Sequence, residues 1–264
     1  MDEPTRGYQE NFFGLYEKFQ DQENRRGKAE KITHVLGNHC SLPLDEFTCL
    51  DLGCSNGLIT LEIAPLFRQV VGLDYDGPAV RMTPVEKRAE VLFIHGDAMR
   101  LPFPDQSFQA IICSQVYEHV PSDLRLFAEI ERILKPGGVV FFSGPNKLFP
   151  IEPHYYLPFL HWLPEKWADA YLRLLRKGSH FYERSRTQWN LRKIFARYQI
   201  RDVSIPVMRL YESRAKSRFT RLVYRLILKS PLFWKSILQF LPNFNWLLYK
   251  PASPAEPTGY EIVS

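Results

Sequence analysis

One stretch constrains the fold more than any other: residues 47–57, FTCLDLGCSNG. Its first half is a short apolar run typical of a buried strand, and a turn built on Gly53 and Gly57 follows. From Leu58 to Leu66, apolar residues recur at the spacing of a helix. A strand, a glycine-rich turn and a helix in this order predict the opening of a nucleotide-binding α/β unit, with its ligand at the carboxyl end of the strand.

The turn excludes two common ligand classes. The dinucleotide fingerprint is G-x-G-x-x-G, but Ser55 occupies its second glycine position and no third glycine follows Gly57. A phosphate-binding P-loop would end in Gly-Lys-Ser/Thr, which does not follow here. Asp51 instead lies two residues before Gly53, a position that favours a cationic ligand with a free amino group. Asp74 ends the next apolar run, where a carboxylate can accept both hydroxyls of an unphosphorylated ribose.

The motifs from about Phe47 to Asn146 resemble those of class I S-adenosylmethionine-dependent methyltransferases. Four segments carry the resemblance in the family's order: LDLGCSNG, VVGLDYD, IHGDAMRLPFPDQSFQAIICSQVYEHV and ILKPGGVVFFSGPN. The nearest resemblance is to the group that includes the quinone-biosynthesis methyltransferases. Two positions depart from the family pattern: Ser55 replaces the commonest glycine, and Gln109 replaces the usual aspartate. A serine with a negative φ would still fit the loop.

The resemblance implies S-adenosylmethionine as cofactor and direct displacement at its sulfonium methyl group. Holding nucleophile, methyl and sulfur in line can supply ~7–11 kcal/mol of such a barrier. By resemblance, Asp97 accepts a hydrogen bond from the adenine amino group, whereas a plain turn role is the alternative for this residue. The cofactor-binding residues that we expect are Asp51, Gly53, Cys54, Ser55, Gly57, Asp74, Tyr75, Asp97, Ala98 and Ser114.

No catalytic residue can be assigned from the sequence. His119 lies near the expected position of the methyl group, and the ordinary pKa of histidine suits a general base. The alternative is that the Glu118-His119 pair only begins the next helix. No metal is implied, because no His/Asp/Glu cluster has ligand spacing. The four cysteines lack paired spacing and read as reduced core thiols.

The predicted fold class is α/β: a doubly wound, Rossmann-like, mostly parallel sheet of seven strands with an antiparallel final strand and helical cap insertions. We expect a single methyltransferase domain over residues 1–264. Its parts are an N-terminal helical segment (1–46), a cofactor-binding core (47–146), an aromatic cap insertion (147–185), the rest of the sheet (186–250) with a basic amphipathic helical insertion at about 211–241, and a loose tail (251–264).

Two segments outside the core suggest contacts near the ligand. Tyr8 and Tyr16 in the N-terminal segment are candidates for a lid over the cofactor, although simple packing on the sheet explains them as well. The cap insertion is rich in proline and aromatic residues, which suits an apolar or sugar-bearing acceptor. A satellite core is the equal alternative there. Its candidate acceptor contacts are His154, Tyr155, Tyr156, His161 and Trp162.

Charge is distributed unevenly along the chain. Residues 1–150 hold 15 Lys/Arg and 21 Asp/Glu, whereas residues 151–264 hold 19 and 8, so an acidic half precedes a basic half within a net charge of +5. Cations at helical spacing form one stripe: Arg214, Arg218, Arg221, Arg225 and Lys229. Large apolar residues fill the other face. This pattern predicts an interfacial helix on an anionic membrane that does not span it, and a solvated surface helix is the alternative.

The predicted function is transfer of the methyl group of S-adenosylmethionine to a small-molecule acceptor, preferably a lipid or lipid-linked intermediate such as an isoprenoid quinone or a glycolipid. One alternative is a nucleic-acid methyltransferase. It is disfavoured because the cations are interleaved with bulky aliphatic residues and no N/D-P-P-Y/F motif occurs. The other is a catalytically silent cofactor-binding protein that docks at a membrane. The acidic N-terminus is not a signal peptide, so we expect a cytoplasmic protein, peripheral at the inner face of a membrane.

Overall fold

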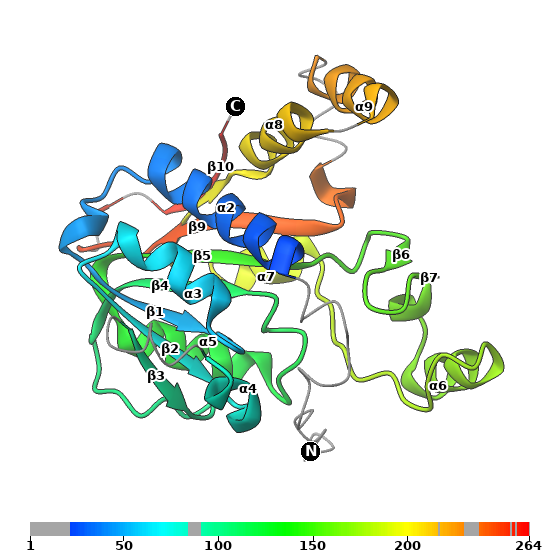
Figure 1. The fold of residues 1–264 in the computed structure, drawn as a ribbon, viewed down its shortest axis with the longest axis horizontal. Helices are drawn as coiled ribbons and strands as arrows, with labels where there is room; N and C mark the ends of the chain where they lie inside the picture. The colour runs from blue at the N-terminus through cyan, green and yellow to red at the C-terminus, as the bar shows by residue number, and fades with distance from the viewer. Residues whose placement is uncertain are drawn as a thin grey trace.

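The computed structural model of this chain describes residues 22–83, 91–215, 217–229, 238–253, 255–256 and 258–263. The tyrosines expected in a lid, Tyr8 and Tyr16, lie outside these ranges. The first described element is helix α2, Gln22–His39, which lies across one face of the sheet (Figure 1). It buries Ile32, Val35 and Leu36 in the core beneath it.

A mostly parallel sheet forms the centre of the molecule, as the sequence predicts. Its order is β10-β8-β9-β5-β4-β1-β2-β3, and among these strands only β9 runs antiparallel to its neighbours. The strands are β1 Thr48–Leu52, β2 Gln69–Asp74, β3 Leu92–His95, β4 Phe108–Ser114, β5 Leu134–Pro145, β8 Gln199–Asp202, β9 Asn243–Tyr249 and β10 Gly259–Ile262.

The described strands number eight in this sheet, one more than the seven predicted, and the expected antiparallel strand is confirmed as β9. The additional strand, β10, lies in the tail that was expected to be loose, and it pairs in parallel with the edge strand β8. An edge strand presents unpaired backbone groups that a further segment can satisfy. Tyr260 fixes the pairing, because its hydroxyl donates to Asp202 Oδ2 at 2.6 Å and its ring packs against Trp246.

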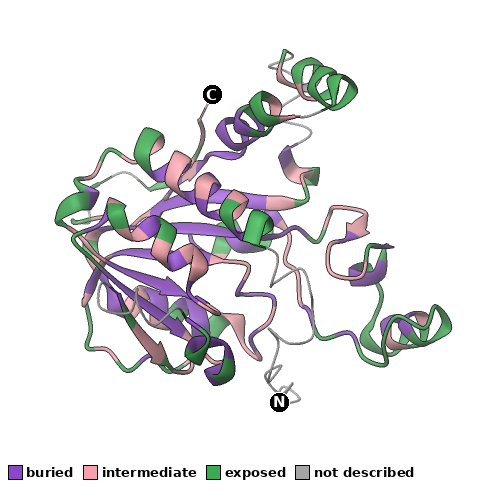
Figure 2. Cartoon of the chain, in the orientation of Figure 1, coloured by how far each residue is buried: buried purple, intermediate pink, exposed green. Residues whose placement is uncertain are grey.

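Helices cover both faces of the sheet and leave its central strands buried, whereas the edge strands β3 and β10 stay partly exposed (Figure 2). Successive side chains of a strand point to opposite faces. Phe142 accordingly joins the core beneath α5 (Asp123–Ile133) and α7 (Gln188–Ile194). Phe141 joins the core beneath α2, α3 (Leu58–Ile63) and α8 (Ser204–Arg214). Burial on both faces explains why the strands read as continuous apolar runs instead of alternating ones.

The order of the strands places a ligand crevice at one point of the sheet. β1 lies between β2 and β4, so the chain leaves β1 toward β2 and β3 on one side and later returns to β4 on the other. The connections diverge at this switch point and leave a crevice beyond the carboxyl ends of β1 and β4. Helix α4, Gly77–Arg81, follows β2 near the same end of the sheet (Figure 1).

The cap insertion forms a lobe beside the sheet, with a hairpin of β6 (Ile151–Glu152) and β7 (Leu157–Pro158) and helix α6, Glu165–Leu174 (Figure 1). Part of its apolar content builds a satellite core, which was one of the two alternatives. That core consists of Leu157, Leu160, Ala168, Leu172 and Phe181, with Tyr155 and Tyr171 packed against it.

The basic stripe does not lie on one helix, and this part of the prediction is wrong. Strand β8 ends at Asp202, α8 follows it at once, and the helix ends at Arg214 because Ala215 adopts an extended ψ of 115°. A new helix, α9 (Arg218–Leu228), begins after Ser217, whose side chain accepts a hydrogen bond from the Thr220 amide. Residues 230–237 lie outside the described ranges. Among the described helices, none has the length and apolar character needed to cross a membrane.

Candidate active site

The loop after β1 brings the backbone close to neighbouring side chains at two glycines. Gly53 has a φ of +80°, and a Cβ there would lie 2.5 Å from Val116 Cγ2. Gly57 has a φ of +76°, and a Cβ there would lie 2.6 Å from the ring of Phe93. Both positions combine a left-handed backbone with too little space for a side chain, so glycine is required at each.

Ser55 adopts a φ of +54°, so the expectation of a negative φ at this residue is wrong. Two neighbours hold it in the left-handed region. Its backbone amide donates a 2.7 Å hydrogen bond to Asp74 Oδ2, and Arg25 Nη2 donates to its hydroxyl at 3.3 Å. These contacts oppose a left-handed cost of roughly 1–2 kcal/mol for a non-glycine residue.

Two carboxylates border the space in front of this loop. Asp74 accepts backbone hydrogen bonds from Ser55 on Oδ2 and from Asp76 on Oδ1, at 2.7 and 2.8 Å. Asp51 accepts a 2.6 Å hydrogen bond from the hydroxyl of Thr60. Burial raises the pKa of Asp51 to about 6 and also raises the pKa of Asp74. The two side chains therefore favour a ligand that brings positive charge or hydroxyl donors.

A pocket opens between the loop, α2 and the end of β4. Of the ten expected cofactor-binding residues, Asp51, Gly53, Ser55, Asp74, Tyr75, Ala98 and Ser114 line it. The other three do not. Gly57 lies against Phe93, Cys54 is buried, and Asp97 accepts a hydrogen bond from the Met99 amide on its own turn. The further lining residues are Arg25, Lys28, Ile32, Ile59, Leu73, Asp76, Gln115, Val116, His119 and Val120.

Helix α2 contributes cationic residues that the sequence reasoning did not select. Arg25 and Lys28 line the pocket from one turn of this helix. Burial lowers the pKa of Arg25, and the charges of Asp51 and Asp74 oppose that shift. The available signal was the RRGK run ahead of the first strand, where two basic residues stand three apart. The packing of this helix over the loop could not be read from the run.

The far wall of the pocket comes from the end of β4. Gln115 has a φ of +60°, and the chain turns sharply here after Ser114. The backbone amide of Gln115 donates a 2.7 Å hydrogen bond to the carbonyl oxygen of Ser143. His119 follows and lines the pocket as well, as expected of a residue near the methyl group. None of the aromatic residues of the cap insertion is among the lining residues.

The residues present fit S-adenosylmethionine. A carboxylate has about four acceptor positions, and the two backbone amides occupy only two of those on Asp74, which leaves one on each oxygen for a ribose hydroxyl. Asp51 adds a carboxyl group to the lining of the same pocket. The absence of a P-loop lysine and the presence of two carboxylates disfavour a pyrophosphate.

Comparison with known proteins agrees with this fit. A family model for the methyltransferase domain matches residues 50–142. The chain is 36% identical over 99 residues to a probable S-adenosylmethionine-dependent methyltransferase of Mycolicibacterium smegmatis, which is 38% of each protein. It is 34% identical over 181 residues to a ubiquinone biosynthesis O-methyltransferase of Nitrosococcus oceani, which is 66% of this chain and 72% of that protein. The alignment thus spans well under half of the first relative's length.

A solved structure shows the same fold. Phosphoethanolamine N-methyltransferase 1 of Haemonchus contortus, in complex with phosphoethanolamine and S-adenosylhomocysteine, superposes with a TM-score of 0.56 over 92% of this chain and 47% of that one. The sequence identity is 13%, so the likeness concerns the fold alone.

Proposed function

Because this chain belongs to the class I S-adenosylmethionine-dependent methyltransferases, with S-adenosylmethionine as cofactor, we propose that it transfers a methyl group to a lipid or lipid-linked acceptor while lying on an anionic membrane surface. Relatives named for quinone biosynthesis support a small apolar acceptor. The observation that carries the membrane part of the proposal is the exposed apolar face of α9.

Helix α9 exposes its large apolar side chains to solvent. Phe219 is 74% exposed, Leu226 61% and Leu222 52%, and Val223 lies beside them. Tyr224 and Leu228, on another side of the helix, pack against the small core formed by Ile205, Met208 and Leu238. The helix therefore attaches through one side and exposes a second apolar side to solvent, and it lies apart from the sheet (Figure 1). Burying one such side chain fully gains ~1.5–3 kcal/mol, which a lipid surface can supply.

The cations of α9 flank this apolar face by helical spacing. Arg218, Arg221 and Arg225 share a stripe beside it. Some of the charge is already paired within the protein: Arg225 contacts Glu212 at 3.0 Å, and Arg214 at the end of α8 contacts Glu30. The apolar face is therefore a stronger argument for docking than the basic stripe, which the break at Ala215 interrupts.

The pocket residues define what the chain does with the cofactor. When bound, S-adenosylmethionine supplies an electrophilic methyl group on a sulfonium. Asp74 would hold the ribose hydroxyls and Asp51 would face the cationic end. Ser114, Gln115 and His119 would form the wall next to the methyl group, where the acceptor must enter in line. We propose the ten expected residues as the cofactor site: seven line the pocket, Cys54 and Gly57 belong to the loop that borders it, and Asp97 with Ala98 would meet the adenine ring.

Two measurements test the proposal. Incubation of the protein with lipid extract and cofactor should yield a lipid in which a methyl group replaces a hydrogen, detected by mass spectrometry. The Asp74→Ala variant should not form this product. Sedimentation with anionic vesicles should require the α9 face, so Phe219→Ser with Leu226→Ser should release the protein. Leu174→Ser is the matched control, because Leu174 is 78% exposed on α6. Methylation of a water-soluble extract alone, with no vesicle binding, would contradict the proposal.

A further inference from the structure

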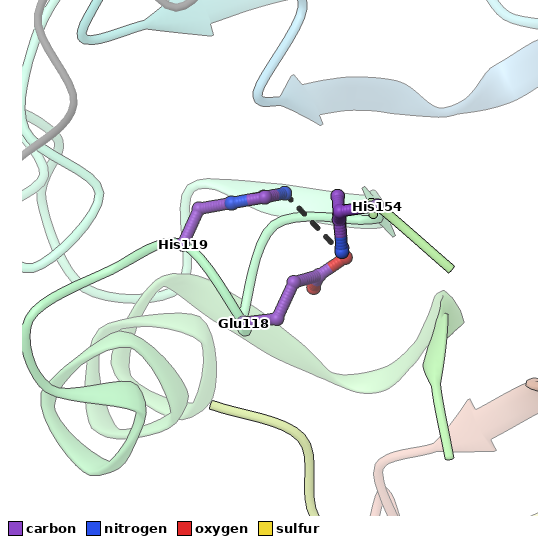
Figure 3. Close-up of side chains that lie close together, drawn as sticks. All are labelled: Glu118, His119 and His154. Atoms are coloured by element: carbon purple, nitrogen blue, oxygen red, sulfur yellow. Dashed lines mark ion pairs between the residues drawn. The ribbon is translucent and has the colours of Figure 1, made fainter. Parts of the chain in front are cut away.

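A cluster of buried titratable side chains lies next to the pocket, at the junction of the core and the cap lobe. Glu118 and His119 come from the segment after β4, and His154 comes from the turn between β6 and β7 (Figure 3). One ligand atom of each residue lies within 4.8 Å of those of the other two. We propose that Glu118, His119 and His154 form a binding site for a divalent transition-metal ion.

The carboxylate of Glu118 is the strongest indication of a cation-binding site. The residue is fully buried, and among the described residues neither carboxylate oxygen has a hydrogen-bond donor. Oε1 of Glu118 lies 3.8 Å from His119 Nε2, too far for a hydrogen bond (Figure 3). A buried carboxylate without hydrogen bonds costs several kcal/mol unless a cation or a proton compensates it. Because Glu118 points toward two imidazoles, a metal ion would satisfy all three groups together.

His154 is oriented in the manner typical of a metal ligand. Its Nδ1 donates a 2.6 Å hydrogen bond to Glu152 Oε1, while its backbone amide donates to Oε2 of the same carboxylate at 2.8 Å. Glu152 is itself fully buried and also accepts from the Tyr155 amide. A carboxylate behind the ring fixes the neutral tautomer with its lone pair on Nε2 and makes that nitrogen a better ligand.

The arrangement of the two rings and the surrounding charge agree with this site. The rings of His119 and His154 lie edge to face with their centroids 4.9 Å apart. The buried carboxylate of Glu183 lies close enough for its charge to act on Glu118 and His154, and the charge of Lys28 also acts on Glu118. Three buried carboxylates, Glu118, Glu152 and Glu183, thus lie around the two imidazoles, a surrounding that favours a divalent cation.

The ligand types narrow the choice of ion. Two imidazoles and one carboxylate suit Zn²⁺ or another first-row divalent ion better than Ca²⁺ or Mg²⁺, which prefer oxygen ligands alone. Ligands of a tetrahedral Zn²⁺ at ~2.1 Å lie ~3.4 Å apart, so roughly 1 Å of side-chain movement would close the site. Because His119 also lines the cofactor pocket, an open coordination position would lie at the wall of that pocket.

The test is a titration of the whole chain with Zn²⁺ after treatment with a chelator. Metal content after equilibrium dialysis should be one equivalent for the wild type and should fall below a tenth of an equivalent in Glu118→Gln and in His154→Asn. Glu152→Gln keeps all three ligands, and we expect it to weaken binding ~10–100-fold, as for other residues that orient a ligand. His180→Asn is the matched control, because His180 is exposed and contacts Asp169 at 3.1 Å away from the proposed site. This variant should keep the full equivalent of zinc.

Folding and cofactor binding are measured separately in every variant. S-adenosylhomocysteine calorimetry and thermal unfolding report whether a variant is folded, so a loss of zinc in a folded variant supports the site. The wild-type titration needs no variant: if it takes up no zinc at micromolar concentration, the proposal is overturned. In that case a proton compensates Glu118, consistent with burial raising the pKa of this carboxyl to about 7. Equal zinc binding by wild type and Glu118→Gln would overturn it too.

Discussion

The backbone amide of Ser55 donates a 2.7 Å hydrogen bond to the carboxylate of Asp74. This contact joins the loop after β1 to the end of β2, so the group expected to hold the ribose also holds the loop. Asp74 therefore stabilises the loop and is also the proposed contact for the ribose, so a substitution that separates these two roles is informative.

Asp74→Ala should weaken binding of both S-adenosylmethionine and S-adenosylhomocysteine. Loss of charge-assisted hydrogen bonds to the ribose costs ~1.5–3 kcal/mol, which is about 10- to 150-fold in the dissociation constant. Calorimetry with each ligand measures it. Asp74→Asn keeps one amide oxygen as an acceptor for Ser55, so it should lose less stability than Asp74→Ala while still losing ligand affinity. Tight binding of NAD by the wild type, without binding of either ligand, would contradict the assignment.

Gly53→Ala should destabilise the protein for two separable reasons. Its Cβ would lie 2.5 Å from Val116 Cγ2, and its φ of +80° is unfavourable for alanine. The backbone part alone is ~1–2 kcal/mol. Adding Val116→Ala should relieve the steric part and leave the backbone part, so the double variant should be more stable than the two single changes predict by addition. Chemical denaturation of the four proteins measures the cycle, and strict additivity would show that Val116 simply moves away.

The stability of the protein should depend on pH through Lys31. Burial lowers the pKa of Lys31 to about 7, helped by the charge of Lys28, and its Nζ donates to Ser143 and Asn245. The unfolded chain binds this proton up to about pH 10. Between pH 7 and 10 the unfolded state therefore binds more protons, and the contribution of Lys31 to the free energy of unfolding rises by up to ~1.4 kcal/mol per pH unit.

Comparison of Lys31→Met with the wild type isolates this effect, since cysteines and tyrosines titrate in both proteins. The free energy of unfolding of Lys31→Met minus that of the wild type, measured by urea denaturation, should fall steadily from pH 7 to pH 10. Lys166→Met, at an exposed position of α6, should show a constant difference. A constant difference for Lys31→Met as well would mean that its ammonium group keeps a near-ordinary pKa.

Changing Arg218, Arg221 and Arg225 together to Gln should release the protein from anionic vesicles. Each Lys or Arg near such a surface contributes ~1 kcal/mol, so three account for roughly a 100-fold change. The loss should be smaller than this if Arg225 stays with Glu212. Raised salt should reproduce the release, because the attraction decays within ~8–10 Å. Cofactor affinity should not change, since these residues do not line the pocket. If the wild type does not bind anionic vesicles at low salt, α9 is only a solvated surface helix and the prediction is wrong.

The sequence by itself determined the fold class, the family and the end of the sheet at which the candidate pocket lies. These depend on local patterns: apolar runs such as VVGLD, the turn after Leu52, and a carboxylate at the end of each of the first two strands. Such patterns indicate which backbone conformation is allowed and which face is apolar, and each of them extends over only a few residues. For that reason seven of the expected contacts line one pocket in the folded chain.

The tertiary structure alone decided which distant groups meet. His154 reaches Glu118 because the cap lobe folds back on the core, and β10 forms because β8 leaves an open edge. The break at Ala215 sits in a stretch where spacing alone favours one continuous helix, and packing of Tyr224 against the core of α8 accompanies the new direction of α9. Contacts of this kind are made between surfaces that exist only after the sheet and its covering helices have assembled, so no local pattern encodes them.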